Sequence, residues 1–164
     1  MPKPPSKPAP PPAERTPAAA LGEGLLRGIV GYQLAQAAVV TDRVFAEHVG
    51  GPLGLRRLEF SLLTLLQANP GATARQLARA LAVTPPNIAV AVERLGQAGL
   101  LQRERGEQDA RLQHLRLTAQ GDAAVGQAVA ALQSAEAEAL AGLSAAERAM
   151  LAELLHKAAL ARRG

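Results

Sequence analysis

Charged side chains gather in the segment "RERGEQDAR", which contains Arg103, Arg105, Asp109 and Arg111. The arginine guanidinium presents a planar fork of N–H donors that suits phosphate oxygens. An arginine that enters a narrow minor groove of DNA also gains from the enhanced negative potential there. The spacing therefore predicts that Arg111 probes a minor groove, that Asp109 braces its guanidinium, and that Arg103 and Arg105 contact phosphates. The alternative is a solvated hairpin with a surface ion pair worth ~0–1 kcal/mol.

A second candidate set lies in residues 84–98, where apolar residues recur at helical spacing. The inward stripe of this helix is expected to comprise Ile88, Ala91, Val92 and Leu95. The outward face then carries Thr84, Pro86, Asn87, Val90 and Arg94. Asn87 can pair bidentately with adenine, Val90 can contact a thymine methyl group, and Arg94 is placed for a phosphate. An ordinary solvated helix face is the alternative.

Helical elements must position both sets. Apolar periodicity predicts a helix over residues 21–48, a loop over "GGPLG" at 50–54, and a helix over 56–68 that stops at "NPG". Capping boxes at Thr73–Gln76 and Ser144–Glu147 predict the start of a short helix at 73–82 and of the last helix. Thr84 is the expected N-cap of the helix at 84–98, and Thr118 of one that runs to Leu140.

Between these helices the apolar period changes from 3.6 to two. Residues 100–105 and 112–117 alternate in polarity and are expected to form two strands around the turn "GEQDA". The fold class is therefore mainly α with a small β-hairpin wing, a winged helix-turn-helix with N- and C-terminal dimerisation helices. The expected divisions are a disordered proline-rich tail (1–20), an N-terminal dimerisation helix and loop (21–55), the winged helix-turn-helix (56–118), and C-terminal dimerisation helices (119–164).

Composition narrows the classes of function. Hydrophobic residues make up 48% of the chain but aromatic residues only 2%, so the core must be built from Leu, Val, Ile and Ala. The absence of cysteine excludes disulfides, thiolate metal ligands and cysteine nucleophiles. A net charge of +4 is compatible with nucleic acid. No apolar run approaches the ~20 residues of a transmembrane helix, so we expect a cytoplasmic protein without a membrane partner.

No constellation of residues suggests catalysis. The three histidines, His48, His114 and His156, are scattered, and none has metal-ligand spacing with another histidine or a carboxylate. The glycine-containing stretches lack the Lys-Ser/Thr ending of a phosphate-binding loop. We therefore expect no enzyme activity, no metal site and no cofactor.

The outer helices carry more apolar surface than one small winged domain can cover. Residues 21–48 present an apolar stripe, and the last helix has an expected buried side of Met150, Leu151, Leu154, Leu155 and Ala158. An isologous homodimer is the commonest way to bury such stripes, and it would present two recognition helices to a pseudo-palindrome. An intramolecular bundle is the alternative.

The segment "RLEFSLLTLLQANPGATARQLARALAVTPPNIAVAVERLGQAGLLQRERGEQDARLQHLRLTAQG" resembles the MarR family of bacterial transcription regulators. The likeness spans about residues 21–162, and the Asp-x-Arg of residues 109–111 with "GLLQR" is its most specific part. The resemblance implies a homodimeric winged-helix regulator with Arg111 in the minor groove and the 84–98 helix in the major groove.

The resemblance also implies a small aromatic or lipophilic effector, because many family members bind aromatic acids beside the dimer helices. Tyr32, Arg43, His48 and Arg56 are the polar groups that could line such a site. Many members carry Thr or Ser and then Arg where this chain has Ala89 and Val90. Two hypotheses follow, a sequence-specific regulator of double-stranded DNA, and a winged-helix dimer used mainly for protein–protein contact.

Overall fold

The computed structural model describes residues 15–19, 21–105 and 113–162, which fall into two compact units divided between Asp42 and Arg43. The first unit contains the 3-10 helix η2 (Gly24–Gly28) and most of helix α1 (Val30–Phe45). Its one buried polar side chain among the described residues is Glu23, which lies against Tyr32 and Arg27.

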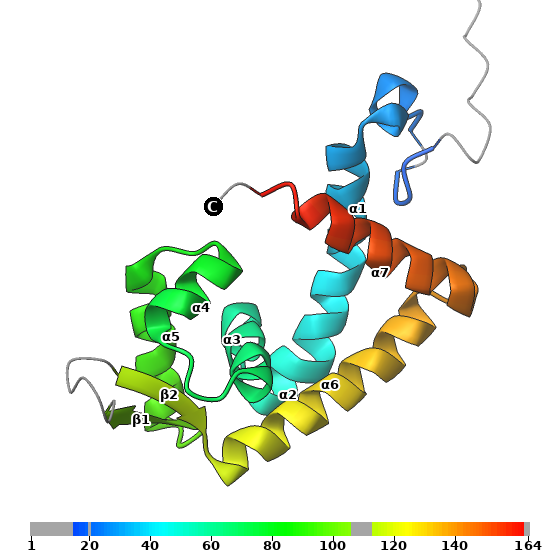
Figure 1. The fold of residues 1–164 in the computed structure, drawn as a ribbon. Helices are drawn as coiled ribbons and strands as arrows, with labels where there is room; N and C mark the ends of the chain where they lie inside the picture. Colours follow the sequence, from blue (N-terminus) through cyan, green and yellow to red (C-terminus); the bar gives the residue numbers. More distant parts are fainter. Residues whose placement is uncertain (1–14, 20, 106–112, 163–164) are drawn as a thin grey trace, which may run out of the picture. The chain divides into compact units, whose positions relative to one another are not determined.

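The second unit contains the remaining elements in a simple order (Figure 1). After the helical segment that ends at Leu53, helices α3, α4 and α5 precede a two-stranded sheet, and α6 and α7 follow it. Their bounds are α3 (Arg57–Ala68), α4 (Ala74–Leu81), α5 (Pro85–Gln97), β1 (Leu101–Arg105), β2 (Gln113–Leu117), α6 (Ala119–Ala139) and α7 (Ala145–Ala159). This arrangement confirms the expected winged helix-turn-helix, with α4 and α5 as the helix pair.

The expected capping residues begin their helices. Thr73 Oγ1 accepts from the Gln76 N–H at 3.3 Å at the start of α4, and Ser144 Oγ accepts from the Glu147 N–H at 3.2 Å at the start of α7. Thr118 Oγ1 accepts from the Gly121 N–H at 3.1 Å at the start of α6. Local side-chain chemistry thus determines where these helices begin.

The N-terminal prediction was partly wrong. The expected helix at 21–48 is interrupted, because Ile29 adopts an extended backbone (φ −94°, ψ 107°) between η2 and α1, which begins only at Val30. The expected loop at 50–54 is instead helical. A π-helical turn, η3 (Ala46–Gly50), leads into the short helix α2 (Gly51–Leu53), which ends at Gly54 with φ 64°. Proline in the first turn of a helix loses no intrahelical hydrogen bond, so Pro52 does not break this segment.

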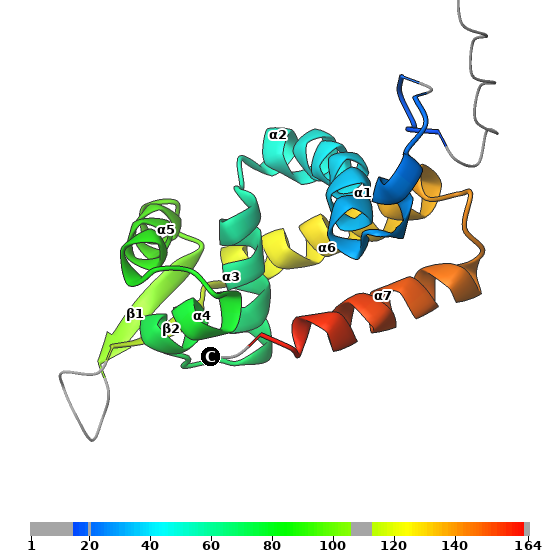
Figure 2. The ribbon, with the colours of Figure 1, turned by 90° about the horizontal axis from the view of Figure 1, so that it is seen from above.

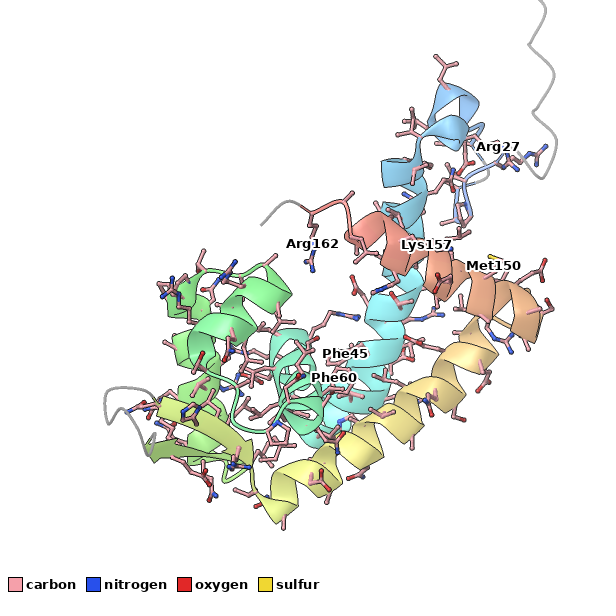
Figure 3. All side chains as sticks on the ribbon, in the orientation of Figure 1. Arg27, Phe45, Phe60, Met150, Lys157 and Arg162 are labelled. Carbon is pink, nitrogen blue, oxygen red and sulfur yellow. The ribbon has the colours of Figure 1, made fainter. Side chains whose placement is uncertain are left out.

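The core of the second unit lies where α3 meets α5, α6 and the sheet. Leu62, Leu63 and Ile88 are at most 1% exposed, and α6 packs across α3 (Figures 1 and 2). Phe45 and Phe60 pack with ring centroids 5.8 Å apart at a 58° tilt (Figure 3). Aliphatic residues, mainly Leu, Val, Ile and Ala, therefore fill this core with very few aromatic rings.

The wing is joined to the helix-turn-helix by backbone hydrogen bonds. β1 and β2 are antiparallel, with Leu101 opposite Leu117 and Arg103 opposite Leu115. On the other edge of β2, the Gly71 N–H donates to the Leu115 carbonyl at 2.9 Å and the Leu115 N–H donates to the Ala72 carbonyl at 3.1 Å. The turn between α3 and α4 therefore acts as a third short strand.

The C-terminal helices meet the rest of the unit in different ways. α6 begins in tight contact, since a Cβ added at Gly121 would lie 1.9 Å from the Leu100 carbonyl oxygen. α7, in contrast, exposes the side that was expected to be buried. Met150 is 58%, Leu151 37%, Leu154 53% and Leu155 41% exposed, and Ala158 is also exposed. The predicted burial of this side is therefore not found within the second unit. No helix in the described ranges is long and apolar enough to cross a membrane.

Candidate nucleic-acid interface

Helix α5 divides into a buried and an exposed face as the sequence predicts. The buried face consists of Ile88, Ala91, Val92 and Leu95, each at most 4% exposed. The exposed face includes Thr84, Pro86, Asn87, Val90 and Arg94. Val90 is 57% exposed and places an apolar side chain in the middle of this face. The structure therefore brings the predicted α5 residues together on one face.

The N-terminus of α5 has an unusual chemistry. Its first two residues are Pro85 and Pro86, which have no N–H, and the Asn87 and Ile88 N–H groups both donate to the Thr84 carbonyl. Helix N-termini commonly bind phosphate through free N–H groups. In α5 the first two residues have no N–H group and the next two N–H groups are already bonded, so none of them is free for a phosphate. The Thr84 hydroxyl makes no capping bond to the helix. Phosphate contacts from α5 must therefore come from side chains.

Arg94 lies one helical turn beyond Val90 and forms an ion pair that the sequence did not predict. Its Nη1 is 2.9 Å from Glu59 Oε1, and the Arg94 side chain is still 42% exposed. Glu59 is only 2% exposed and sits in the first turn of α3. Its other oxygen, Oε2, accepts from the Arg56 N–H at 2.8 Å. The sequence signals the burial of Glu59, which shares the helical spacing of Leu62 and Leu66, but not its partner on another helix.

The described part of the wing holds its cations beside carboxylates. Arg103 Nη2 is 3.1 Å from Glu93 Oε2, which ties β1 to α5, and Arg116 Nε is 2.6 Å from Glu104 Oε2 across the sheet. Arg105 ends β1. Asp109 and Arg111, the predicted minor-groove pair, lie outside the described residues, so their proposed roles rest on the sequence. The wing arginines that the structure describes are oriented groups rather than an open basic patch.

The root of the wing is tied to the turn that precedes α4. The His114 Nδ1 lies 2.6 Å from the Gly71 carbonyl oxygen. A carbonyl oxygen can only accept, so Nδ1 carries the proton in this contact. Together with the two backbone bonds of Leu115, this contact fixes the base of β2 against the helix-turn-helix. The wing and α5 are thus held by the same small core.

The four predicted effector residues are divided between the two units. Tyr32 belongs to the first unit, where its O–H donates to Glu23 Oε1 at 3.4 Å. Desolvation, followed by the adjacent Glu23 carboxylate, raises the pKa of the Tyr32 phenol. Arg43, His48 and Arg56 belong to the second unit, where they are exposed.

A cavity of about 420 Å³ lies elsewhere, between the ends of α3 and α4, and its lining includes Leu65, Pro70, Gln76 and Ala80 but none of the predicted effector residues. Within the described ranges, no group of three or more His, Asp or Glu side chains could hold a metal ion.

Comparisons with known proteins agree with this geometry. The MarR family model matches residues 53–112. The HTH-type transcriptional repressor Rv2887 of Mycobacterium tuberculosis is 34% identical over 106 residues, which are 65% of this chain and 76% of that protein.

Solved structures extend the likeness to most of the chain. The transcriptional repressor CouR bound to a 23-mer DNA duplex matches with a TM-score of 0.77 and 30% identity, over 85% of this chain and 98% of that one. The Rv2887 complex with salicylic acid, from M. tuberculosis, matches with a TM-score of 0.62 and 33% identity, over 78% of this chain and 94% of that one. The chain therefore belongs to the MarR family of winged-helix, DNA-binding transcriptional regulators.

Proposed function

We propose that the protein is a homodimeric repressor that binds a pseudo-palindromic operator in double-stranded DNA. The observation that carries the proposal is α5, a helix anchored by a buried apolar stripe that presents Asn87, Val90 and Arg94 on one exposed face. An α-helix fits the major groove of B-DNA, and winged-helix proteins use the hairpin beside it as a second contact. The DNA complex of CouR supports this assignment.

The proposed contacts divide into those that read bases and those that position the protein. Thr84, Pro86, Asn87 and Val90 face base edges, where Asn87 pairs with adenine and Val90 meets a thymine methyl group. The phosphate and minor-groove contacts come from Arg94, Arg103, Arg105 and Arg111, with Asp109 bracing Arg111.

A second copy of the chain is the proposed partner of the exposed apolar residues. In the first unit, Leu25 is 94% and Ile29 54% exposed, and in α7 Leu154 is 53% exposed. Each region exposes several large apolar side chains, and exposed apolar patches often mark protein–protein interfaces. A two-fold dimer would cover both regions and place two α5 helices about one turn of DNA apart.

A small aromatic or lipophilic acid is the proposed effector. The salicylic acid complex of Rv2887 supports this class of ligand. Arg43, His48 and Arg56 are exposed cationic or titratable groups, and Tyr32 offers a phenol. These four residues are the proposed contacts, with the guanidinium groups placed to pair with a carboxylate.

The direct test is binding to duplexes that tile the DNA flanking the protein's own gene. Fluorescence anisotropy at near-physiological salt should find one duplex bound at least ~10³-fold more tightly than a random duplex of equal length. Salicylate at millimolar concentration should release that duplex. Equal affinity for every duplex would contradict sequence-specific regulation.

One observation favours a second candidate function. Ala89 and the 57% exposed Val90 give the middle of α5 an apolar surface, which suits a protein partner as well as a thymine methyl group. The winged-helix dimer would then serve mainly protein–protein contact. Absence of binding to any duplex, including random DNA at low salt, would select this alternative.

A further inference from the structure

Glu59 is a carboxylate inside an apolar core, and its position calls for an explanation. It shares one stripe of α3 with Leu62, Leu63 and Leu66, which are all at most 1% exposed. Burying an ionised carboxylate is costly unless it is paired and hydrogen-bonded. Glu59 meets both conditions, since Oε2 accepts the Arg56 N–H at 2.8 Å and Oε1 lies 2.9 Å from Arg94 Nη1.

The other half of the pair is directed outward. The Arg94 side chain is 42% exposed, and within the described residues only its contact with Glu59 occupies the guanidinium. Arginine has further N–H donors in the same plane, fixed in direction once one of them is bound. Because Arg94 follows Asn87 by seven residues and Val90 by four, the three side chains lie along one stripe of α5. Arg94 therefore starts from the same stripe of α5 as the proposed base-reading residues, and its half-exposed guanidinium keeps donors that Glu59 does not bind.

The start of α5 makes a side-chain phosphate contact more important. Pro85 and Pro86 lack N–H groups, and the next two N–H groups bond to Thr84. The helix therefore cannot use its N-terminus to bind DNA phosphates in the usual way. Arg94 is the cation on the exposed stripe of α5, and the buried Glu59 carboxylate orients its guanidinium.

We propose that Glu59 is a positioning residue for DNA binding, which holds the Arg94 guanidinium so that its remaining donors meet a backbone phosphate. Glu59 itself touches no DNA. The inference rests on the proposed function. An arginine held in place before binding loses less side-chain entropy when it meets the phosphate. The competing explanation is that the pair only ties α3 to α5.

The sign of one substitution separates these explanations. Glu59→Gln removes a negative charge beside the DNA-binding face, so simple Coulomb attraction predicts tighter binding to any DNA. Positioning predicts the opposite for the operator, because Arg94 loses its charged anchor. The glutamine carbonyl can still accept the Arg56 N–H, and its volume is similar, so the core is preserved.

The experiment compares wild type, Glu59→Gln, Arg94→Met and the double variant on the duplex that wild type binds and on a random duplex. Each single variant should weaken operator binding by about tenfold, and the double variant should be no weaker than Arg94→Met, since coupled residues are not additive. The slope of log Kd against log salt should fall by ~0.9 in Arg94→Met. In Glu59→Gln the slope should also fall, toward the value of Arg94→Met. A merely structural link would leave this slope unchanged.

Controls keep the outcomes distinct. Glu138→Gln removes the same charge from the exposed surface of α6 and should leave operator affinity unchanged. If Glu59→Gln fails to fold by thermal melting, Arg94→Lys at the half-exposed end of the pair takes its place, and it should also weaken the operator complex and lower the slope. The inference would be overturned if Glu59→Gln bound the operator as tightly as wild type or more tightly. If Arg94→Lys has taken the place of Glu59→Gln, the same result for Arg94→Lys would overturn it. Failure of wild type to bind any duplex would instead refute the proposed function.

Discussion

Asn87 is the residue of α5 that we propose to read a base. Its side chain is exposed one turn past the N-cap of α5, whereas the next residue, Ile88, is buried. Asn87→Ala should cost about 1–3 kcal/mol on the cognate duplex and relax the preference at one position per half-site. Competition binding with singly substituted duplexes measures both effects. Equal losses on cognate and random DNA would reassign Asn87 to the phosphate backbone.

Arg111 is the corresponding residue of the wing. Arg111→Ala should weaken operator binding strongly and flatten the log K against log salt slope by about one unit, with circular dichroism and molecular mass unchanged. Asp109→Ala is the matched control, and its effect should be smaller because Arg111 keeps its charge and loses only its brace. Wild-type affinity of Arg111→Ala at near-physiological salt would show that the hairpin does not read DNA.

Single residues differ in how far the sequence could predict them. The buried stripe of α5 follows from helical spacing alone, and the structure confirms Ile88, Ala91, Val92 and Leu95. The ion pair between Glu59 and Arg94 could not be predicted, because it joins two helices whose mutual placement depends on the whole core. Spacing shows which face a residue occupies, but a contact across elements requires the tertiary structure.

The start of α6 provides a test at the scale of elements. A Cβ at Gly121 would overlap the Leu100 carbonyl oxygen, whereas a Cβ at Gly126, in the same helix, would meet no atom within 4 Å. Gly121→Ala should lower the free energy of unfolding by about 1–3 kcal/mol or more through overpacking. Gly126→Ala should raise it by roughly 0.5–1 kcal/mol, because alanine favours the helix. Urea denaturation distinguishes the two, and equal effects would contradict the close approach.

The caps of α4 and α5 should respond differently to the same substitution. Thr73 Oγ1 accepts the Gln76 N–H, whereas the Thr84 side chain makes no capping bond. Thr73→Ala should therefore cost about 1 kcal/mol of stability, and Thr84→Ala less. In DNA binding the order should reverse, because Thr84 lies at the proposed interface. Thermal melting and anisotropy on the two variants check both orders.

Element boundaries could be predicted wherever a local signal determines them. Capping boxes and a change of apolar period located α4, α7 and both strands correctly. The segment 50–54 was predicted as a loop because Gly and Pro are frequent in turns, yet it is helical up to Gly54. Pro52 is compatible with a first helical turn, so the local signal was ambiguous, and the fold decided between the two conformations.

The assembly is the prediction that concerns the whole molecule. Light scattering at micromolar concentration should give twice the chain mass of 17.0 kDa. Replacing Leu154 and Leu155 by Asp should yield the single-chain mass, because two carboxylates would be buried without partners in the dimer. Ala149→Asp, on another side of α7, is the control and should leave the dimer intact. A wild-type protein of single-chain mass would refute the dimer.

The paired cations of the winged segment have a consequence for how the protein finds its target. Arg94, Arg103 and Arg116 each lie against a carboxylate, so the long-range attraction between this surface and any DNA is reduced. A genome offers ~10⁶–10⁹ competing sites, and a surface of unpaired cations would keep most copies on irrelevant sequence. Ion pairing shortens each such encounter. Under the proposed function, more copies then remain free to search, and fewer molecules per cell should suffice to occupy the operator.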